Sequence, residues 1–543
     1  MLPRSIASAT PAAIVRAAAA FALVAAALTV TVYAFSRLND GMMHNDLGND
    51  EGYFVWCGWS VLKGLVPYRD FMEFKPPIAF LTHALALKLY GLQDLQFRRF
   101  FFYFPLASVL AVQLALFSRK ADTLCTLAAA LALVQVWVNP HLHDTALSDT
   151  ESIGLAYYFL GTALLLTRPP VESLRNPLRV LGGAVLACSI LSKEPFLPQV
   201  FFTWIGCFFA TEAALGEGRL SLASVRAPAV RAEAIRYAKY TVLGAAIVAL
   251  GLVLYMAPTG SLKAYIAMAG RYSTVYRDPA RSFCAVGGVF EPTTPMNDVV
   301  RFWSRAQREF LNVSTLGALV PFALAFAVFT AKRSPLLFGA GVLAAATALY
   351  GVNISNCPWI HYYNIAIGGF FFCAFLGVDA MTAYLRAADP ATRAFVRFVV
   401  VGLTLACVWP SIDAERDAFG RRSFPRRFSE AVPGEFDVIR DNSRPGDYVF
   451  TSGNPALYFE TDRLNAVRES TLIDPMMGFY AGDTDEDRLR PVYDELVKHR
   501  PKVVVLDPQF ASQKERHRAA LFDPYLHAFN YREVRPHIFV GPN

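Results

Sequence analysis

The sequence predicts a helical membrane domain followed by a smaller α/β domain that lies outside the membrane. Of the 543 residues, 54% are hydrophobic and only 17% are charged, and the apolar residues occur in long runs. A helix needs about 20 apolar residues to cross a hydrocarbon layer of roughly 30 Å. Many stretches before residue 413 meet this requirement and none after it does, so we expect a membrane domain at 1–412 and an α/β domain at 413–543.

About eleven membrane-crossing helices are expected in the first domain, from the length of its apolar runs. The first run resembles a signal peptide, but it is long enough to span and more membrane segments follow, which indicates a retained helix. The approximate ranges are 12–35, 100–117, 124–138, 152–167, 180–191, 196–215, 240–256, 314–330, 336–354, 365–383 and 398–412.

Basic residues gather in alternate loops between these helices, for example at Arg119 and Lys120 and again at 219–239. Such loops face the cytoplasm by the positive-inside rule, so the net charge of +7 reflects topology rather than nucleic-acid binding. The amino terminus is then cytoplasmic. An odd number of crossings places the α/β domain and the segment 46–77 on the outer face, which is periplasmic if the membrane is a bacterial inner membrane.

The outer segment 46–77 follows the first helix and is predicted to contain two helices that lie on the membrane surface. The first, at about 51–63, carries Trp56 and Trp59, and Trp favours the headgroup level of a bilayer. The second, at 77–90, opens on a proline, which the first turn of a helix tolerates, and is short for a membrane span. These helices frame Asp50, Glu51 and Lys75.

Two further segments complete the organisation of the chain. The long polar stretch 258–312 is predicted to be an outer loop and is a candidate lid over a bound substrate. In the final domain, β-rich runs at 448–453, 503–507 and 537–541 alternate with a polar helical stretch at 485–499, between turn signals. This pattern is typical of an α/β domain, and the sequence contains no glycine-rich phosphate loop.

Charged residues on the outer side are the functional candidates, because topology already accounts for those facing inward. Carboxylates also suit helix N-termini, a lysine can extend to lipid headgroups, and paired arginines can bind phospholipid phosphates as well as a lipid-linked substrate. These structural interpretations stay open for each candidate. The candidates are Asp50, Glu51, Glu73, Lys75, Arg98, Arg99, Asp149, Glu151, Lys193 and Glu194.

Histidine and cysteine residues give weaker signals. His141, His143 and Asp144 suggest a metal site, but the histidine spacing suits a strand and no third strong ligand is near, so neither a metal nor another cofactor is expected. The stretch that begins at His361 and Tyr362 fits an aromatic belt at the interface and could also contact a sugar or phosphate. The cysteines form no CxxC motif and indicate no disulfide framework or zinc site; Cys284 and Cys357 remain a possible pair on the outer side.

Taken together, these residues resemble the GT-C superfamily of integral-membrane glycosyltransferases, in particular the protein O-mannosyltransferases and the lipid A aminoarabinose transferase. The resemblance covers about residues 10–410. It rests on an Asp-Glu pair after the first helix, a Lys-Pro near the end of the outer segment, two surface helices, an acidic position before the fourth helix and a basic one before the second. The matching residues are Asp50, Glu51, Lys75, Pro76, Asp149 or Glu151, and Arg98 or Arg99, with weaker matches at Lys193 and at 361–363.

One departure from the family pattern concerns Glu73. In the aminoarabinose transferase a Glu directly precedes the Lys-Pro, whereas here Phe74 intervenes and Glu73 stands one residue further back. The metal-binding role of that Glu is therefore not carried over to Glu73.

The resemblance implies a GT-C membrane fold and a sugar donor linked to polyprenyl phosphate, with transfer to an acceptor hydroxyl and inversion at the anomeric carbon. Asp50 would be the base, with Glu51 or Glu151 orienting a substrate. Phosphate is a good leaving group, so cations are needed rather than the general acid of a glycosidase. The phosphate-binding candidates are Lys75, Arg98, Arg99 and Lys193, and the substrate-orienting candidates are Asp149, Glu151, His361 and Tyr362.

Two alternatives remain. A transporter or flippase for lipid-linked sugars would use similar outer cations, but it would be expected to carry charged residues near helix centres and paired repeats. A ligase-type enzyme would rely on basic residues in a large outer loop, without an acidic pair after the first helix. The identity of the sugar and of the acceptor, whether protein, lipid A, polysaccharide or another lipid, is left open.

Overall fold

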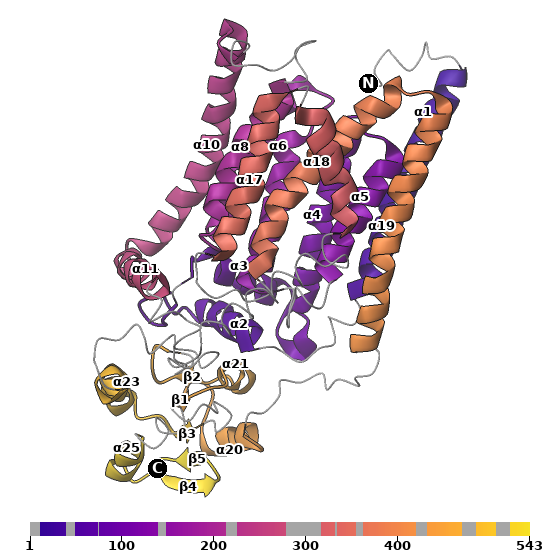
Figure 1. The fold of residues 1–543 in the computed structure, drawn as a ribbon. Coiled ribbons are helices and arrows are strands. Elements are labelled where there is room, and N and C mark those ends of the chain that lie inside the picture. The colour runs from indigo at the N-terminus through magenta and orange to yellow at the C-terminus, as the bar shows by residue number, and fades with distance from the viewer. Residues whose placement is uncertain are drawn as a thin grey trace, which may run out of the picture.

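In the computed structural model, a bundle of helices carries a small five-stranded sheet at one end (Figure 1). The structure describes residues 11–39, 49–73, 75–138, 148–212, 225–277, 317–331, 334–353, 362–419, 432–469, 485–506 and 522–542.

Eleven helical segments in the described residues build the bundle, close to the ranges expected from the apolar runs. Among these residues, six helices are long and apolar enough to cross a membrane, namely α1, α4, α10, α17, α18 and α19. The segments are α1 (Pro11–Asn39), α4 (Arg98–Ser118), α5 (Thr123–Val138), α6 (Thr150–Leu166), α7 (Arg175–Ile190), α8 (Phe196–Glu212), α10 (Pro228–Met256), α15 (Val320–Ala325) with the π-helical turn Phe326–Thr330, α17 (Pro335–Asn353), α18 (Tyr363–Ala387) and α19 (Pro390–Phe419).

Two of these helices extend well beyond the predicted ranges. Helix α10 begins at Pro228 rather than near 240. Proline suits a first helical position, and the charged segment that follows it, through Lys239, is rich in residues that favour helices. Helix α19 continues past residue 412 to Phe419. In both helices, the apolar run that spans the bundle is shorter than the helix itself.

Helices α7 and α10 cross at glycines, which allow their backbones to touch. A Cβ atom added at Gly183 would lie 2.0 Å from the carbonyl oxygen of Thr241, and one at Gly244 would lie 1.9 Å from that of Val180. No side chain fits at such distances, so the close crossing requires glycine at both positions.

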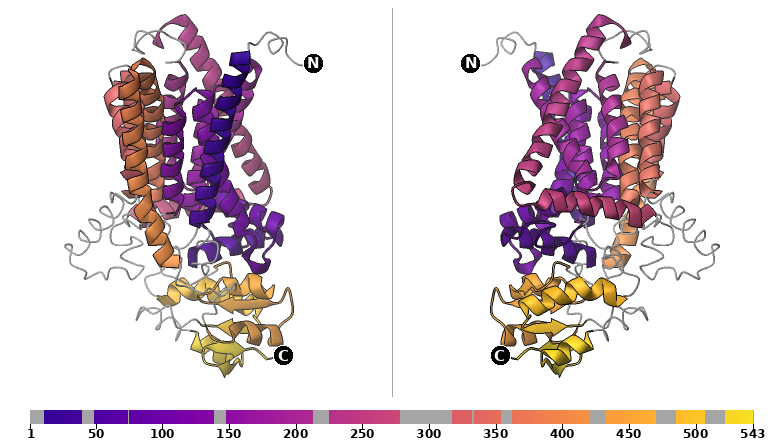
Figure 2. Two further views of the ribbon diagram at one scale, coloured as in Figure 1. Left: turned by 90° about the vertical axis from the view of Figure 1, so that its right-hand side faces the viewer. Right: turned by 90° about the vertical axis from the view of Figure 1, so that its left-hand side faces the viewer.

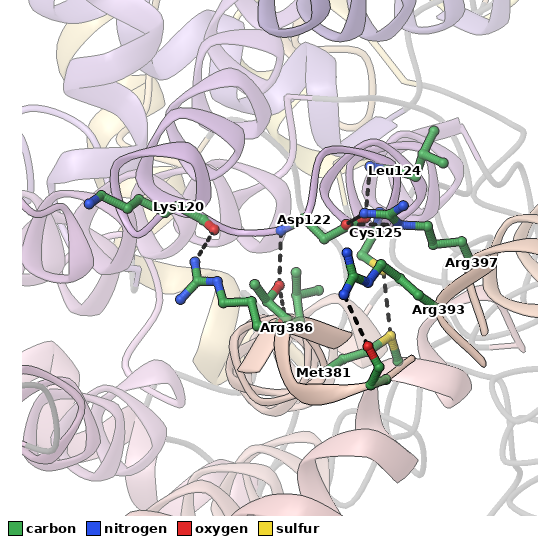
Figure 3. Close-up of polar contacts among 11 residues, drawn as sticks. Lys120, Asp122, Leu124, Cys125, Met381, Arg386, Arg393 and Arg397 are labelled. Carbon is green, nitrogen blue, oxygen red and sulfur yellow. Dashed lines mark hydrogen bonds and ion pairs between the residues drawn. The ribbon is translucent and has the colours of Figure 1, made fainter. Parts of the chain in front are cut away.

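At the end of the bundle far from the sheet, side chains and backbone join the turn after α4 to α18 and α19 (Figure 3). The guanidinium of Arg397 donates to the carboxylate of Asp122, with Nε 3.0 Å from Oδ2. Arg386 donates to the carbonyl oxygen of Lys120. These contacts use part of the basic surface that the positive-inside rule predicts at this end.

Three helices lie across the end of the bundle that faces the sheet (Figures 1 and 2). They are α2 (Asn49–Leu62), α3 (Ile78–Tyr90) and α11 (Ser261–Arg277). The first two occupy the places predicted for surface helices.

Helix α11 corrects the prediction of a polar loop at 258–312, because the first part of that stretch is helical. Leu262, Tyr265 and Met268 recur at three-residue spacing and pack against the core, which gives the segment an apolar face. The hydroxyl of Ser261 donates to the carbonyl oxygen of Pro67 at 2.6 Å and joins α11 to the first outer segment. The rest of the predicted loop and lid lies outside the described residues.

The sheet combines a parallel part and an antiparallel part, in the order β2-β1-β3-β5-β4. Strand β1 (Tyr448–Thr451) pairs in parallel with β2 (Leu464–Asn465) and β3 (Val503–Val505), while β5 (Ile538–Val540) runs antiparallel to β3 and to β4 (Arg532–Arg535). The helices of this unit are α20 (Glu435–Asn442), α21 (Ala456–Thr461), α23 (Asp485–His499) and α25 (Asp523–Ala528).

The α/β class of this unit agrees with the prediction, and β1, β3, β5 and α23 lie where the sequence placed them. Strands β2 and β4 were not predicted. Strand β2 has only two residues, and β4 is an exposed edge strand with the sequence REVR, so neither carries the run of apolar residues that predicts a strand.

Candidate functional site

The first turn of α2 contains Asp50 and Glu51 and lies beside the sheet-bearing unit. A Cβ atom added at Gly52 would be 3.9 Å from Cγ of Pro455, which precedes α21. Trp56, one turn further along, packs its ring 5.9 Å from that of Tyr458. The start of α2 is therefore held between the helical bundle and the last part of the chain.

Glu51 and Arg98 form a two-pronged ion pair between the first turns of α2 and α4. Nη2 of Arg98 lies 2.7 Å from Oε2 of Glu51, and Nε lies 3.1 Å from Oε1. The side chains are 2% and 5% exposed, so the pair is removed from water. Two parallel hydrogen bonds are the geometry in which a guanidinium holds a carboxylate best.

A second buried ion pair joins Lys193, in the turn between α7 and α8, to Glu151 in the first turn of α6. The hydroxyl of Thr150 donates to the other oxygen of the same carboxylate at 2.7 Å. The Lys193 amine also lies 4.6 Å from the centre of the Tyr362 ring, at the start of α18. Three parts of the chain that are distant in sequence therefore meet around one amine.

Lys75 reaches the same place from the segment between α2 and α3. Its backbone N–H donates to Oε1 of Glu73 at 2.8 Å, and its carbonyl oxygen accepts from the hydroxyl of Tyr68 at 2.6 Å. Its amine lies 5.3 Å from the centre of the Phe54 ring and interacts with the side chain of Lys193. The backbone of this segment is thus fixed on both sides of the lysine, and its amine is directed toward a second cation.

The turn that carries Lys193 is also joined to the Lys75 segment by a backbone hydrogen bond, from the N–H of Ile78 to the carbonyl oxygen of Leu191 at 3.0 Å. Burial is the largest single influence and would lower the pKa of Lys193, but the carboxylate of Glu151, with Glu194 and Lys75, together raises the pKa above its ordinary value. Lys193 is therefore charged at neutral pH despite its burial.

Glu194 and Glu73 surround these amines with further negative charge. Burial raises the pKa of Glu194, while Lys193 and Lys75 oppose that shift. The phenol of Tyr68 has a raised pKa for the same first reason, burial, with Tyr265 and Glu73 adding to it. The cluster is a layer of basic and acidic side chains at the ends of several helices that face the sheet.

The remaining predicted residues have different surroundings. Oδ1 of Asp149 accepts from the N–H of Ser152 at 2.6 Å and caps α6, as the structural interpretation of that residue predicted. Arg99 is exposed. Several candidates lie outside the described residues, namely His141, His143, Asp144, Cys284, Cys357 and His361. Within the described ranges, no group of three or more metal-ligating side chains comes together.

Several residues of this cluster were not predicted as functional. Phe54, Tyr68 and Tyr265 are aromatic residues in surface helices or loops, where aromatics are common, and only the fold brings Tyr68 and Tyr265 together, with ring centres 4.9 Å apart. The signal that could have identified Tyr68 is the density of aromatic and charged residues in the stretch 66–75.

The arrangement of the helical bundle and of the surface helices before α4 is the GT-C fold, as the resemblance in sequence predicted, and solved structures share it. The crystal structure of the oligosaccharyltransferase of Archaeoglobus fulgidus in complex with zinc and sulfate superposes with a TM-score of 0.51 at 14% identity, over 93% of this chain and 71% of that one. The archaeal oligosaccharyltransferase AglB of the same organism, in complex with an inhibitory peptide and a dolichol-phosphate, gives 0.50 at 14% identity, over 95% and 74%.

ArnT from Cupriavidus metallidurans, in its apo state, gives a TM-score of 0.51 at 12% identity, over 97% of this chain and all of that one. No protein-family model matches the sequence. A search of curated protein sequences gives no match either. At these identities the likeness concerns the fold.

Proposed function

We propose that the protein is a glycosyltransferase that moves a sugar from a polyprenyl-phosphate donor to an acceptor hydroxyl at the outer face of a bacterial inner membrane. The observation that carries this proposal is the convergence of Lys75 and Lys193, from separate elements, near the start of α2. Two neighbouring amines held in place are suited to an anion, and the solved structures with this fold include one with a dolichol-phosphate.

The phosphate of the donor is proposed to bind between Lys75 and Lys193. Charge develops on the phosphate as its bond to the sugar breaks, and cations fixed in advance stabilise that charge. Arg98 contributes less directly than the sequence suggested, because its guanidinium is engaged with Glu51. The exposed Arg99 is assigned to the outer part of the phosphate or to headgroups nearby.

Asp50 is proposed as the base. In a single displacement, the acceptor oxygen attacks the anomeric carbon, the bond from that carbon to the phosphate oxygen breaks, and the acceptor proton passes to Asp50, which inverts the anomeric centre. Both oxygens of Glu51 face Arg98, so Glu51 positions the turn that carries Asp50. Glu151 acts through Lys193, while Asp149, His361 and Tyr362 are the proposed neighbours of bound substrate.

The topology that this function requires is also part of the proposal. About eleven crossings of the roughly 30 Å hydrocarbon layer would place α2, α3 and the α/β unit on the periplasmic side, with 1–412 as the membrane domain and 413–543 as the outer domain. The donor sugar is a hexose or pentose, and the acceptor is a glycan, a lipid or a protein.

The experiment begins with mass spectrometry of glycolipids and envelope glycans from cells with and without the protein, which identifies the sugar and the product. Transfer is then measured with the purified protein, the identified donor and the acceptor from which the product is formed. Asp50→Asn should lower the rate by about 10² to 10⁴-fold, the usual contribution of a positioned base, while insertion and folding are unchanged. A matched control is Glu172→Gln, an exposed carboxylate that pairs with Arg175 at the surface.

Three outcomes would contradict the proposal. An Asp50→Asn variant that keeps most of the wild-type rate would remove Asp50 as base. Movement of the lipid-linked sugar across vesicle membranes without transfer would favour a flippase. Transfer of a preassembled chain that needs no carboxylate at position 50 would favour a ligase-type enzyme.

A further inference from the structure

A layer of polar side chains lies inside the bundle, in the first turns of three helices near the Glu151–Lys193 ion pair in sequence. Ser152, Gln199 and Asn364 lie in the first turns of α6, α8 and α18, and their side chains are 1%, 0% and 0% exposed. Ser152 follows Glu151 in sequence and Asn364 comes two residues after Tyr362, so the layer begins where the ionic cluster ends.

Contacts between these helices hold the layer together. Nδ2 of Asn364 lies 3.5 Å from Oγ of Ser152. Gly368 is one turn further along α18, on the same face as Asn364. A Cβ atom at Gly368 would lie 3.2 Å from Oε1 of Gln199 and 3.1 Å from Cε1 of Tyr158. The absence of a side chain at Gly368 leaves the room into which the Gln199 amide extends.

Neither end of the Gln199 amide has a partner among the described residues. Both Oε1 and Nε2 are buried and make no hydrogen bond within this part of the chain. A buried amide without partners destabilises a fold, and an apolar side chain of the same size would avoid that cost. An amide that can both donate and accept is therefore expected to meet a partner that is not part of the chain.

We propose that Gln199 recognises the sugar ring of the lipid-linked donor, with its amide donating to one ring hydroxyl and accepting from another. This inference rests on the proposed function, which puts the donor phosphate at Lys193, in the turn that leads into α8. The sugar is bonded directly to that phosphate, so its ring must lie next to the phosphate site. Hydroxyl groups offer both donors and acceptors, which matches the two unsatisfied ends of the amide.

The test compares two glutamines that differ in location only. Gln113, in α4, is also 0% exposed, and neither of its amide atoms has a partner in the described ranges. It lies about four turns from Arg98 along the helix and so toward the opposite end of the bundle. Gln199→Leu and Gln113→Leu each remove a buried unsatisfied amide, so both variants should fold with thermal midpoints equal to or above that of the wild type.

In transfer assays, Gln199→Leu should lower kcat/KM for the donor at least tenfold, and it should no longer distinguish donors that differ by one ring hydroxyl. Gln113→Leu should change neither. Unchanged rate and sugar selectivity in Gln199→Leu would overturn the inference and leave a buried water as the partner of this amide.

A binding measurement separates failure of this inference from failure of the proposed function. The sugar-linked polyprenyl phosphate should raise the thermal midpoint of the wild type more than polyprenyl phosphate alone does, since any ligand that prefers the folded state stabilises it. Gln199→Leu should lose that increment and Gln113→Leu should keep it. An equal increment in both variants would refute sugar recognition by Gln199, whether or not transfer is observed, whereas absence of transfer by the wild type would refute only the reaction.

Discussion

Glu51 and Arg98 are 47 residues apart and form a bidentate ion pair that is almost completely buried. The pair joins the first turn of α2 to the first turn of α4, so it determines the position of the turn that carries Asp50. The proposed role of Asp50 therefore depends on how the surface helix α2 packs against the bundle helix α4.

Replacing one residue of this ion pair should lower the stability of the protein more than replacing both. Glu51→Gln leaves the Arg98 guanidinium buried without its charge partner, and breaking a buried pair in this way costs about 3 to 5 kcal/mol. The double variant Glu51→Gln with Arg98→Met should unfold at a higher temperature than the single variant. Thermal unfolding of the purified protein in detergent measures both, and equal loss in the two variants would show that the ion pair is not the origin of the effect.

The Glu151–Lys193 pair gives a prediction about pH. Burial lowers the pKa of Lys193, but Glu151, with smaller contributions from Glu194 and Lys75, more than offsets burial and raises it in the wild type. The amine therefore stays charged throughout the neutral and mildly alkaline range. In Glu151→Gln, burial is opposed less and the pKa of Lys193 falls. Transfer by this variant should then decline as pH rises above that lowered pKa, by about tenfold per pH unit, where the wild-type rate is still level.

The control for this profile is Glu172→Gln, because the Glu172 side chain is 70% exposed and lies in a different loop. Its pH profile should follow that of the wild type. If Glu151→Gln lowers the rate by the same factor at every pH, then Glu151 does not maintain the charge of Lys193.

The sequence predicted which charged residues lie at the same end of the helices, but it did not predict how these residues pair. Sidedness placed Glu151 and Lys193 at the same membrane face, because the distribution of basic loops reports on which side a helix ends. It does not report on the angular position of a residue around the bundle. That angle depends on helix packing, so the assignment of Glu51 to Arg98 and of Glu151 to Lys193 required the structure.

The same limit explains two errors in the predicted elements. Helix α11 was predicted as a loop because its apolar residues are few and mixed with polar ones, and it becomes stable only by packing on the first outer segment through Ser261 and Tyr265. Strand β2, with two residues, exists only because β1 supplies its pairing. Elements whose stability comes from a distant neighbour give weak local signals.

The crossing of α7 and α10 predicts that alanine substitutions at two glycines of α10 differ strongly in their effect on stability. Gly244→Ala would place a methyl group 1.9 Å from the carbonyl oxygen of Val180, so the helices must separate. We expect a clear drop in thermal midpoint, from a loss of several kcal/mol as the packed surface opens. Gly251→Ala, two turns further along α10, meets nothing within 4 Å and should be neutral or stabilising by up to about 1 kcal/mol, through helix propensity.

The alternative outcome for this pair is informative. Similar midpoints for Gly244→Ala and Gly251→Ala would mean that the two helices do not touch at Gly244, and the arrangement of α7 against α10 would have to be revised. Gly183→Ala tests the same contact from the other helix, since its added methyl group would lie 2.0 Å from the carbonyl oxygen of Thr241.

The burial of Glu469 predicts that the α/β unit is less stable at alkaline pH than at mildly acidic pH. Glu469 follows β2, its side chain is buried, and neither carboxylate oxygen has a hydrogen-bond partner in the part of the chain that the structure describes. Burial, with a smaller contribution from Glu495, raises the pKa of Glu469 from 4.5 to about 7. The residue before it, Arg468, accepts the backbone hydrogen bond of Met72 at 2.8 Å, so this carboxyl lies next to the contact with the first outer segment.

The sign of the effect follows from proton binding. Between pH 4.5 and about 7 the folded state holds a proton on Glu469 that the unfolded state has released, so the free energy of unfolding falls as pH rises through this window. The full loss, roughly 3 kcal/mol for such a shift, is present above pH 7.

Glu469→Gln stays neutral at every pH and should unfold at a higher temperature than the wild type at pH 8, while the two should be nearly equal at pH 4.5. Glu533→Gln, on the exposed edge strand β4, should show no such change with pH. A Glu469→Gln variant whose midpoint follows that of the wild type from pH 4.5 to 8 would mean that Glu469 is already ionised and solvated in the folded protein.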